Sequence, residues 1–113
     1  MEYKNFKDEI KLSRLGLGNM RLPVKADEQG QPIDYEKAKE IIDYSLKHGI
    51  NYYDTAYIYH NGESEGFVGK ALAEYPRDSY YVADKYNFQA KPDYRAQFAE
   101  QLERLQMDYI DFY

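Results

Sequence analysis

The stretch from Gly49 to Leu72, GINYYDTAYIYHNGESEGFVGKAL, contains the pattern that decides the fold. Its residues Ile50–Thr55 form a short run typical of a strand. A polar loop follows at Tyr59–Gly62, and apolar residues then recur at helical spacing from about Ser64 to Glu74. The stripe expected to be buried on that helix consists of Phe67, Val68, Ala71 and Leu72. The stretch therefore predicts a strand that leads through a loop into a helix.

The residues near the N-terminus predict a short hairpin and one further strand. Tyr3–Phe6 and Ile10–Lys11 are expected to pair around a turn at Lys7–Glu9. The apolar segment Ser13–Leu17 is expected to be a buried strand. Asn19–Ile33 contains prolines, a glycine and several charges without periodicity, which predicts a long loop.

A first helix is predicted over Tyr35–Lys47. Asp34 is a suitable N-cap, because its carboxylate can accept a hydrogen bond from an N–H of the first turn. Gly49 supplies a stop, because glycine readily adopts the left-handed conformation that ends many helices. Residues that recur at helical spacing on one face are Ala38, Ile41, Ile42, Ser45 and Leu46. This face is expected to cover a sheet.

The second half of the chain repeats the pattern. Pro76–Ser79 predicts a turn, Tyr80–Asp84 a strand, and Tyr109–Tyr113 a final strand. Pro92 suits the first turn of a third helix, where its missing N–H costs nothing. The face of that helix expected to be buried consists of Tyr94, Phe98, Leu102 and Leu105, and the i,i+4 pair expected to be exposed consists of Glu100 and Arg104.

Strands and helices therefore alternate along the chain, which predicts an α/β fold with parallel strands, right-handed crossovers and helices outside the sheet. Two architectures have this order. A doubly wound open sheet is complete at about this length, whereas an eight-fold (β/α)8 TIM barrel needs ~250 residues. Length favours the open sheet, but the residues at the predicted strand ends favour the first half of a barrel.

Composition excludes several kinds of function. Fifteen basic and twenty acidic residues give a net charge of −5, which repels nucleic acid. Without cysteine, this segment has no disulfide, thiolate metal ligand or cysteine nucleophile, and no spacing typical of a metal site is present. No run of ~18 apolar residues suggests a membrane helix, and the opening MEYKNFKDEI lacks the apolar stretch of a secretory signal. We therefore expect a cytoplasmic protein.

Three polar side chains are expected to meet at one end of the sheet. Asp54 and Lys85 end consecutive predicted strands, about one strand–helix–strand repeat of ~30 residues apart, so they should be neighbours. Tyr59 lies in the loop that leaves the same strand end as Asp54, at the face where barrel enzymes place their active sites. A tyrosine phenol has a reference pKa of ~10, and a lysine beside it favours the phenolate. The group suits proton donation to an alkoxide, which forms when a carbonyl receives a hydride.

These segments resemble the aldo/keto reductase family. The stretch GINYYDTAYIYHNGESEGFVGKAL is similar to the family signature, and the corresponding residues are Asp54, Thr55, Ala56 and Tyr59. VADKY resembles the family's lysine segment at Lys85, and LGLGNMRLP resembles its first-strand glycine motif. MDYIDFY resembles the fourth strand that normally runs on into a catalytic histidine. GLGNMRLP and the tyrosine-rich segment most resemble bacterial members with a C-terminal iron–sulfur region.

The resemblance implies strands 1 to 4 and three helices of a partial TIM barrel, with residues 1–113 as one truncated domain after a short hairpin. It implies a reductase that uses NADPH or NADH to convert aldehydes and ketones to alcohols. Tyr59 would donate the proton with help from Lys85 and Asp54, and Gly18, Asn19 and Met20 would lie near the nicotinamide. The family's histidine and the strands that hold the cofactor's phosphates follow later, so this chain alone is expected to be an incomplete fragment.

Taken singly, each of these residues has a plainer explanation. Asp54 could be a turn residue, Tyr59 one of 14 tyrosines, and Lys85 a surface lysine, so only their joint placement indicates catalysis. Asp84 departs from the family pattern, and its carboxylate is expected to alter the pairing of Lys85. His60 adjoins Tyr59, where an exposed loop histidine is more common than one that touches substrate.

Two other functions compete with the reductase. A half barrel leaves strand edges and an apolar inner face uncovered, so the chain could be a non-enzymatic fragment that self-associates. A flavodoxin-like binding module would need a phosphate-cradling loop after the first strand. The segment Gly18–Ile33 has prolines and acids where that loop would have small residues, which counts against the module.

Overall fold

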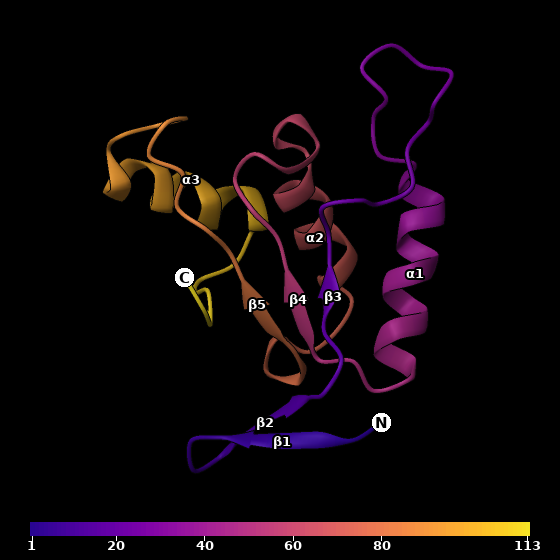
Figure 1. Cartoon of the computed structure of the whole chain (residues 1–113), viewed down its shortest axis with the longest axis vertical. Coiled ribbons are helices and arrows are strands. Elements are labelled where there is room, and N and C mark those ends of the chain that lie inside the picture. Colours follow the sequence, from indigo (N-terminus) through magenta and orange to yellow (C-terminus); the bar gives the residue numbers. More distant parts are fainter.

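The computed structural model describes residues 1–113 as an α/β unit. A hairpin precedes a three-stranded parallel sheet with three α-helices (Figure 1). The elements are β1 (Tyr3–Phe6), β2 (Ile10–Ser13), β3 (Leu17–Gly18), α1 (Tyr35–Lys47), β4 (Tyr52–Asp54), the 3₁₀ turn η1 (Tyr59–Gly62), α2 (Ser64–Leu72), the 3₁₀ turn η2 (Arg77–Ser79), β5 (Tyr81–Ala83) and α3 (Tyr94–Leu105). None of the helices has the length and apolar character needed to cross a bilayer. The predicted α/β class is confirmed, and the sheet is open within these residues.

The N-terminal hairpin has the predicted pairing. β1 and β2 run antiparallel, and Lys7 adopts the left-handed conformation in the turn, with φ 55°. The predicted strand Ser13–Leu17 is wrong in its bounds, because Ser13 belongs to β2 and β3 begins only at Leu17. The N–H of Ser13 donates to the side-chain oxygen of Asn51 (2.8 Å), and the Ser13 hydroxyl donates to the carbonyl of Leu15 (2.6 Å). These side-chain bonds hold a bend where continuous strand was expected.

The sheet brings the C-terminal ends of its strands to one edge. β3, β4 and β5 lie side by side in parallel, with Gly18 opposite Asp54 and Asp54 opposite Ala83. Loops that leave this edge lie at the far end of the molecule from the hairpin (Figure 1). One hydrophobic cluster joins the sheet to the helices and includes Ile42, Tyr53, Val68, Val82 and Leu105.

The predicted fourth strand, Tyr109–Tyr113, is reduced to a single parallel bridge between Ala83 and Phe112. The carboxylate of Asp111 explains this difference. It accepts the backbone N–H of Val82 at 2.8 Å, which in a regular ladder would pair with a backbone carbonyl. Arg77 donates to the same carboxylate oxygen at 2.8 Å. A side chain therefore takes the place of one rung of the ladder.

Helix α1 follows its prediction closely. Asp34 caps it by accepting the N–H of Lys37 at 3.3 Å, and Gly49 has φ 94° after the last turn. A side chain at Gly49 would be strained in that conformation and would also clash with Tyr3. The fully buried positions of the helix are Ala38, Ile42 and Ser45. Ile41, which the spacing placed on the same face, is 40% exposed.

Helix α2 buries its predicted stripe, although it ends at Leu72 instead of Glu74. Phe67, Val68, Ala71 and Leu72 are all buried. Gly69 lets α2 approach α3 closely, because a Cβ there would lie 2.2 Å from the carbonyl oxygen of Leu105. Any larger residue at position 69 would push the two helices apart.

The predicted buried face of α3 is confirmed at Leu105, which is fully buried, and wrong at Tyr94, while Phe98 and Leu102 are half-buried. Tyr94 is 58% exposed, and the buried positions are Gln97, Gln101 and Leu105. Gln97 exchanges hydrogen bonds with the backbone of Asn87 (both 2.7 Å), which keeps its buried amide satisfied. An apolar pattern cannot indicate this face, because two of its three buried residues are amides.

The ion pair predicted on α3 between Glu100 and Arg104 forms, but it is not simply exposed. Arg104 does donate to Glu100 at 3.0 Å. It also pairs at 3.0 Å with Glu65 of α2, whose side chain is fully buried. The guanidinium therefore joins the surface of α3 to the interior of the molecule.

Candidate active site

The structure brings Asp54, Tyr59 and Lys85 together at the C-terminal edge of the sheet. Asp54 ends β4, Lys85 follows β5, and Tyr59 opens the 3₁₀ turn after β4. The ammonium of Lys85 donates to Asp54 Oδ2 at 2.7 Å and to the carbonyl of Thr55 at 2.8 Å. It also lies 4.9 Å from the centre of the Tyr59 ring. All three predicted residues therefore share one cluster.

The cluster favours a charged lysine. Partial burial lowers the pKa of Lys85, but the hydrogen bonds with Asp54 and Tyr59 and the negative charge of Asp54 outweigh burial, so the pKa is raised overall. The side chains of Lys85 and Asp54 are 46% and 34% exposed, so a small molecule can reach them. At this edge a fixed ammonium thus lies between a carboxylate and a phenol.

Buried hydroxyls and backbone bonds fix the segment that carries Asp54. The backbone N–H of Thr55 donates to Ala83 at 2.9 Å, and its hydroxyl lies 2.8 Å from the hydroxyl of Ser64. Both hydroxyls are fully buried. Ser64 is the first residue of α2, so the start of this helix is tied to the end of β4.

The turn that presents Tyr59 has an unusual backbone. His60 and Asn61 both adopt left-handed conformations, with φ 52° and 54°. Asparagine tolerates this region better than most residues, whereas histidine needs support from its surroundings. The Nε2 of His60 accepts the backbone N–H of Leu22 at 3.1 Å. The expectation of a merely exposed loop histidine is wrong, because His60 is half-buried and ties the long loop to this turn.

The residues expected near a nicotinamide lie at the end of β3 and differ in their surroundings. Gly18 is exposed, and a Cβ there would meet nothing within 4 Å. Met20 is 55% exposed. Asn19 is fully buried, and its backbone N–H and its amide group both donate to the carbonyl of Asp54 at 2.9 Å. The side-chain oxygen of Asn19 has no hydrogen-bond donor.

Asp84 does not compete with Asp54 for the ammonium of Lys85. Its carboxylate is 3% exposed and accepts the backbone N–H of Lys85 at 2.8 Å. It lies beside Glu65 of α2, between the sheet and the helices. The expected change in ammonium pairing is therefore wrong. Strand alternation, which sends successive side chains to opposite faces, is the signal that indicates this placement.

Comparison with known proteins identifies the chain. Residues 14–113 match the aldo/keto reductase family. The chain belongs to this family. The aldo-keto reductase YhdN of Bacillus subtilis is 37% identical over 125 residues, which cover 100% of this chain and 37% of that protein. A probable aldo-keto reductase of Glycine max is 31% identical over 92% of the chain and 32% of its own length. The chain thus spans about a third of the length of these curated relatives.

Solved structures of the aldo/keto reductase family have the same fold over this part. The holo form of the aldo-keto reductase AKR11C1 of Bacillus halodurans superimposes with a TM-score of 0.72 at 33% identity, over 97% of this chain and 38% of that one. An aldo-keto reductase of Klebsiella pneumoniae in complex with NADPH gives a TM-score of 0.74 at 25% identity, over 89% of this chain and 34% of that one.

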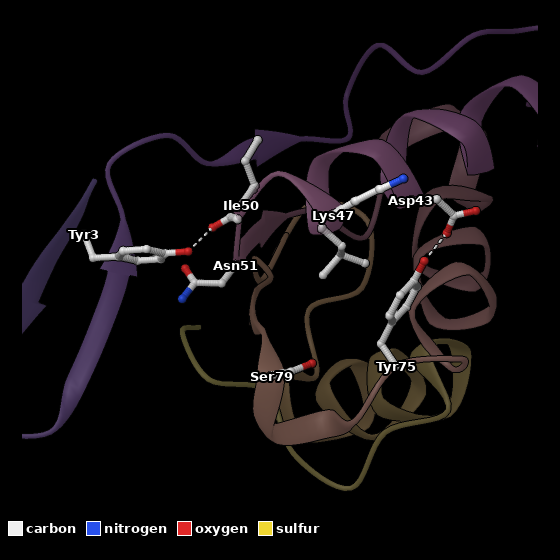
Figure 2. Close-up of a pocket in the computed structure, with 9 residues that line it drawn as sticks. Tyr3, Asp43, Lys47, Ile50, Asn51, Tyr75 and Ser79 are labelled. Carbon is white, nitrogen blue, oxygen red and sulfur yellow. Dashed lines mark hydrogen bonds between the residues drawn. The ribbon is translucent and has the colours of Figure 1, made fainter. Parts of the chain in front are cut away.

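This aldo/keto reductase chain has a second tyrosine–aspartate–lysine group at the opposite end of the sheet. Tyr75 and Asp43 line a pocket of about 610 Å³ near the hairpin, which Tyr3, Lys47 and Ser79 also line (Figure 2). The phenol of Tyr75 donates to Asp43 at 2.5 Å, and Lys39 pairs with the same carboxylate. The pocket touches the start of the signature stretch at Gly49, Ile50 and Asn51, but none of Asp54, Tyr59 and Lys85 lines it.

Proposed function

We propose that this chain carries the proton-donor centre of an NAD(P)H-dependent reductase of aldehydes and ketones. Tyr59 is the proton donor, Lys85 tunes it, and Asp54 holds Lys85. The observation that carries the proposal is the position of the Lys85 ammonium, 2.7 Å from Asp54 and 4.9 Å from the Tyr59 ring. Membership in the aldo/keto reductase family supports the class of reaction.

The arrangement of Asp54, Lys85 and Tyr59 explains how the cluster can donate a proton. When bound, the nicotinamide cofactor supplies a hydride to the carbonyl carbon, and negative charge grows on the oxygen. The phenol of Tyr59 gives that oxygen its proton and becomes a phenolate. The ammonium of Lys85 stabilises the phenolate, because an opposite charge within a few ångströms favours the ionised form. Asp54 keeps the ammonium in place through a charge-assisted hydrogen bond.

Gly18, Asn19 and Met20 are proposed to border the nicotinamide. The open space at Gly18 and the exposed Met20 suit a flat ring that lies over the end of β3. Asn19 is buried beneath this surface, and its two hydrogen bonds to the carbonyl of Asp54 fix the end of the neighbouring strand. The Klebsiella pneumoniae enzyme in complex with NADPH supports NADPH as the cofactor, and NADH stays a second candidate.

The likeness to longer relatives also bears on the architecture. We propose that residues 1–113 form the first part of a (β/α)8 barrel, in which β3, β4, β5 and the segment at Phe112 are the first four strands. In that arrangement a catalytic histidine and most of the cofactor site lie in further strands. A carbonyl compound approaching Tyr59 would then be enclosed by the whole barrel.

An NADPH titration of the chain tests the proposal, with binding followed by nicotinamide fluorescence. In a longer chain that includes the further strands, we expect saturable binding that weakens at least threefold in Gly18→Val, because a branched side chain fills the space at the end of β3. Residues 1–113 alone should bind NADPH much more weakly, because most of the proposed cofactor site lies outside them. Gly66→Val is the matched control, since a Cβ at Gly66 also meets nothing within 4 Å but lies on α2. Equal weakening by both changes would contradict the assignment of Gly18. Tight saturable binding by residues 1–113 alone would contradict the placement of most of the cofactor site in further strands.

A further inference from the structure

A buried carboxylate lies directly behind the proposed site. Asp84 adjoins Lys85 in the sequence, and only 3% of its surface is exposed. One of its oxygens, Oδ1, accepts the N–H of Lys85 at 2.8 Å. The other, Oδ2, is buried and has no hydrogen-bond donor. A buried ionised carboxylate with a free oxygen is costly, so this position needs an explanation.

A second carboxylate faces the first. Glu65 of α2 is fully buried, and its two oxygens accept hydrogen bonds from Arg104 (3.0 Å) and Gln101 (2.9 Å). Its side chain is within hydrogen-bond reach of Asp84. Two carboxyl groups in contact are stable when one of them holds a proton. Since Glu65 has an arginine partner and Asp84 has none, the proton belongs on Asp84.

Gln101 connects this pair to the backbone of Lys85. Its amide group donates to Glu65 at 2.9 Å and to the carbonyl of Lys85 at 2.9 Å. Its own carbonyl oxygen accepts the hydroxyl of Tyr113 at 2.5 Å. Asp84 thus holds the N–H of Lys85 and Gln101 holds its C=O, so both backbone groups of that residue are fixed from the helix side.

We propose that Asp84, Glu65 and Gln101 are positioning residues for Lys85, and that Asp84 works as a neutral acid that shares its proton with Glu65. The network does not touch substrate. It sets where the Lys85 backbone lies, and from there the ammonium reaches Asp54 and Tyr59. The effect on rate rests on the proposed reductase function, whereas the protonation of Asp84 does not.

The surroundings of Asp84 support the neutral form. Burial, and then the hydrogen bond and charge of Glu65, raise the pKa of Asp84 well above its usual range, against a smaller opposite effect of Lys85. The charged and titratable groups that face the pair are Lys85 from its own strand end, Glu65 from α2, Arg104 from α3 and Tyr113 from the C-terminal segment. Because the folded state holds a proton that the unfolded state releases near pH 4, stability falls as pH rises from there through the folded pKa.

The first experiment measures the unfolding equilibrium of the wild type, Asp84→Asn and Asp108→Asn between pH 5 and 8. Asparagine mimics the neutral acid, and Asp108 is an exposed aspartate on the turn after α3. We expect the unfolding constant of the wild type to rise by up to about tenfold per pH unit relative to Asp84→Asn, as for one proton. Asp108→Asn should follow the wild type. A parallel pH dependence of the wild type and Asp84→Asn would overturn the protonation of Asp84.

If Asp84→Asn does not fold, the wild-type protein still gives the answer. The carboxyl carbon of Asp84 can be followed by ¹³C NMR from pH 3 to 8. A resonance that stays at the protonated position through pH 6 supports the proposal. A resonance that titrates near pH 4 like an ordinary aspartate overturns it.

The second experiment tests positioning with two buried glutamines of α3. Gln101→Met removes the bond to Lys85, whereas Gln97→Met removes equivalent bonds to Asn87 and Lys91. We expect Gln101→Met to lower kcat for carbonyl reduction roughly tenfold with KM nearly unchanged, as for a displaced catalytic group. Gln97→Met should keep the wild-type kcat even where it costs similar stability. Asp84→Ala should also lose kcat roughly tenfold, and Asp84→Asn should recover most of that loss.

The failures of the two proposals are distinguishable. Inactivity of a chain that includes the further strands would count against the reductase, while the Asp84 titration and the pKa of Lys85 would still test the network. Gln101→Met should lower the pKa of Lys85, followed by NMR at its side chain, because the ammonium moves away from Asp54. Equal kcat values, and equal Lys85 titrations, in Gln101→Met and Gln97→Met would overturn the positioning role.

Discussion

Two groups, each of a tyrosine, an aspartate and a lysine, lie toward opposite ends of the sheet and are connected in different orders. At the C-terminal edge, Lys85 donates to Asp54, and the Tyr59 ring lies beside the ammonium. Near the hairpin, Tyr75 donates directly to Asp43. Lys39 pairs with Asp43 and lies 5.6 Å from the Tyr75 ring. The residue types and the distance between ring and ammonium are similar in the two groups. They differ in whether the tyrosine hydroxyl donates a hydrogen bond to the aspartate, so the reactivity of the phenol must depend on that bond.

The order of connection decides whether the phenol can give up its proton. The hydrogen bond to Asp43, followed by burial, raises the pKa of Tyr75. That phenol is held in its neutral form, and its proton is already committed to a carboxylate. At Tyr59 the carboxylate is occupied by Lys85 instead, so the phenol stays available to an incoming oxygen. Under the proposed function, the group near the hairpin is a structural clamp and the group at the C-terminal edge is a proton donor.

The largest expected effect separates the two tyrosines. Tyr59→Phe should lower kcat for NADPH-dependent aldehyde reduction by about 10²–10⁴-fold, the usual contribution of a general acid. Binding of NADPH, measured by nicotinamide fluorescence, should change little. Tyr75→Phe should leave kcat within about twofold and lower the unfolding free energy by about 1 kcal/mol, through loss of one hydrogen bond. Similar losses of kcat in both variants would remove the distinction between donor and clamp.

The two lysines provide the next test. Lys85→Met should lower kcat by about 10²-fold, because the phenolate that forms on Tyr59 loses its nearby charge. Lys39→Met should leave kcat unchanged and reduce stability by about 0.5–1 kcal/mol, as expected for a largely surface ion pair. Steady-state kinetics and urea denaturation of the two variants measure these effects. A wild-type kcat in Lys85→Met would show that the ammonium has no part in the reaction.

The two aspartates should act on different partners. Asp54→Asn removes the group that raises the pKa of Lys85, so this pKa should fall and kcat should drop about tenfold. Asp43→Asn should lower the pKa of Tyr75 towards its ordinary value with no effect on kcat. NMR titrations of the lysine and tyrosine side chains follow both changes. An unchanged Lys85 titration in Asp54→Asn would break the proposed link between the carboxylate and the ammonium.

The sequence predicts the first group well and cannot predict the second. Asp54 and Lys85 end neighbouring parallel strands, and that rule alone places them together. Asp43 lies in the middle of α1 and Tyr75 lies three residues after the end of α2, so their contact depends on how the two helices pack against the sheet. Helix packing has no signal of comparable strength in a single sequence.

Polar residues account for most of the differences in the fold. Gln97 and Gln101 are buried on α3 because their amides bond to backbone groups, whereas an apolar pattern selects Tyr94 and Phe98. Asp111 shortens the fourth strand by accepting a backbone N–H of β5. Hydropathy ranks such residues as surface positions, and only their hydrogen-bond partners reveal that they are interior.

The smallest expected effect is the acid sensitivity of the structural clamp. Partial burial acts to raise the pKa of Asp43, but hydrogen bonds from Lys39 and Tyr75 outweigh it, so the pKa is lowered overall. A carboxylate with a lowered pKa stabilises the fold above its unfolded value of about 4, and this stabilisation is lost as pH falls through the folded pKa. Since 42% of the side chain is exposed, the contribution should be only about 0.5 kcal/mol.

Unfolding of the wild type, Asp43→Asn and Asp78→Asn at pH 7 and at pH 3 measures this contribution. At pH 7 Asp43→Asn should be the least stable of the three, and near pH 3 its deficit relative to the wild type should shrink. Asp78 is an exposed aspartate in η2, and its replacement should match the wild type at both values. If the loss of stability in Asp43→Asn stays constant with pH, the ionised carboxylate of Asp43 does not contribute to it. Asp43 would then stabilise the fold through packing, and its charge would not distinguish the clamp near the hairpin from the donor group.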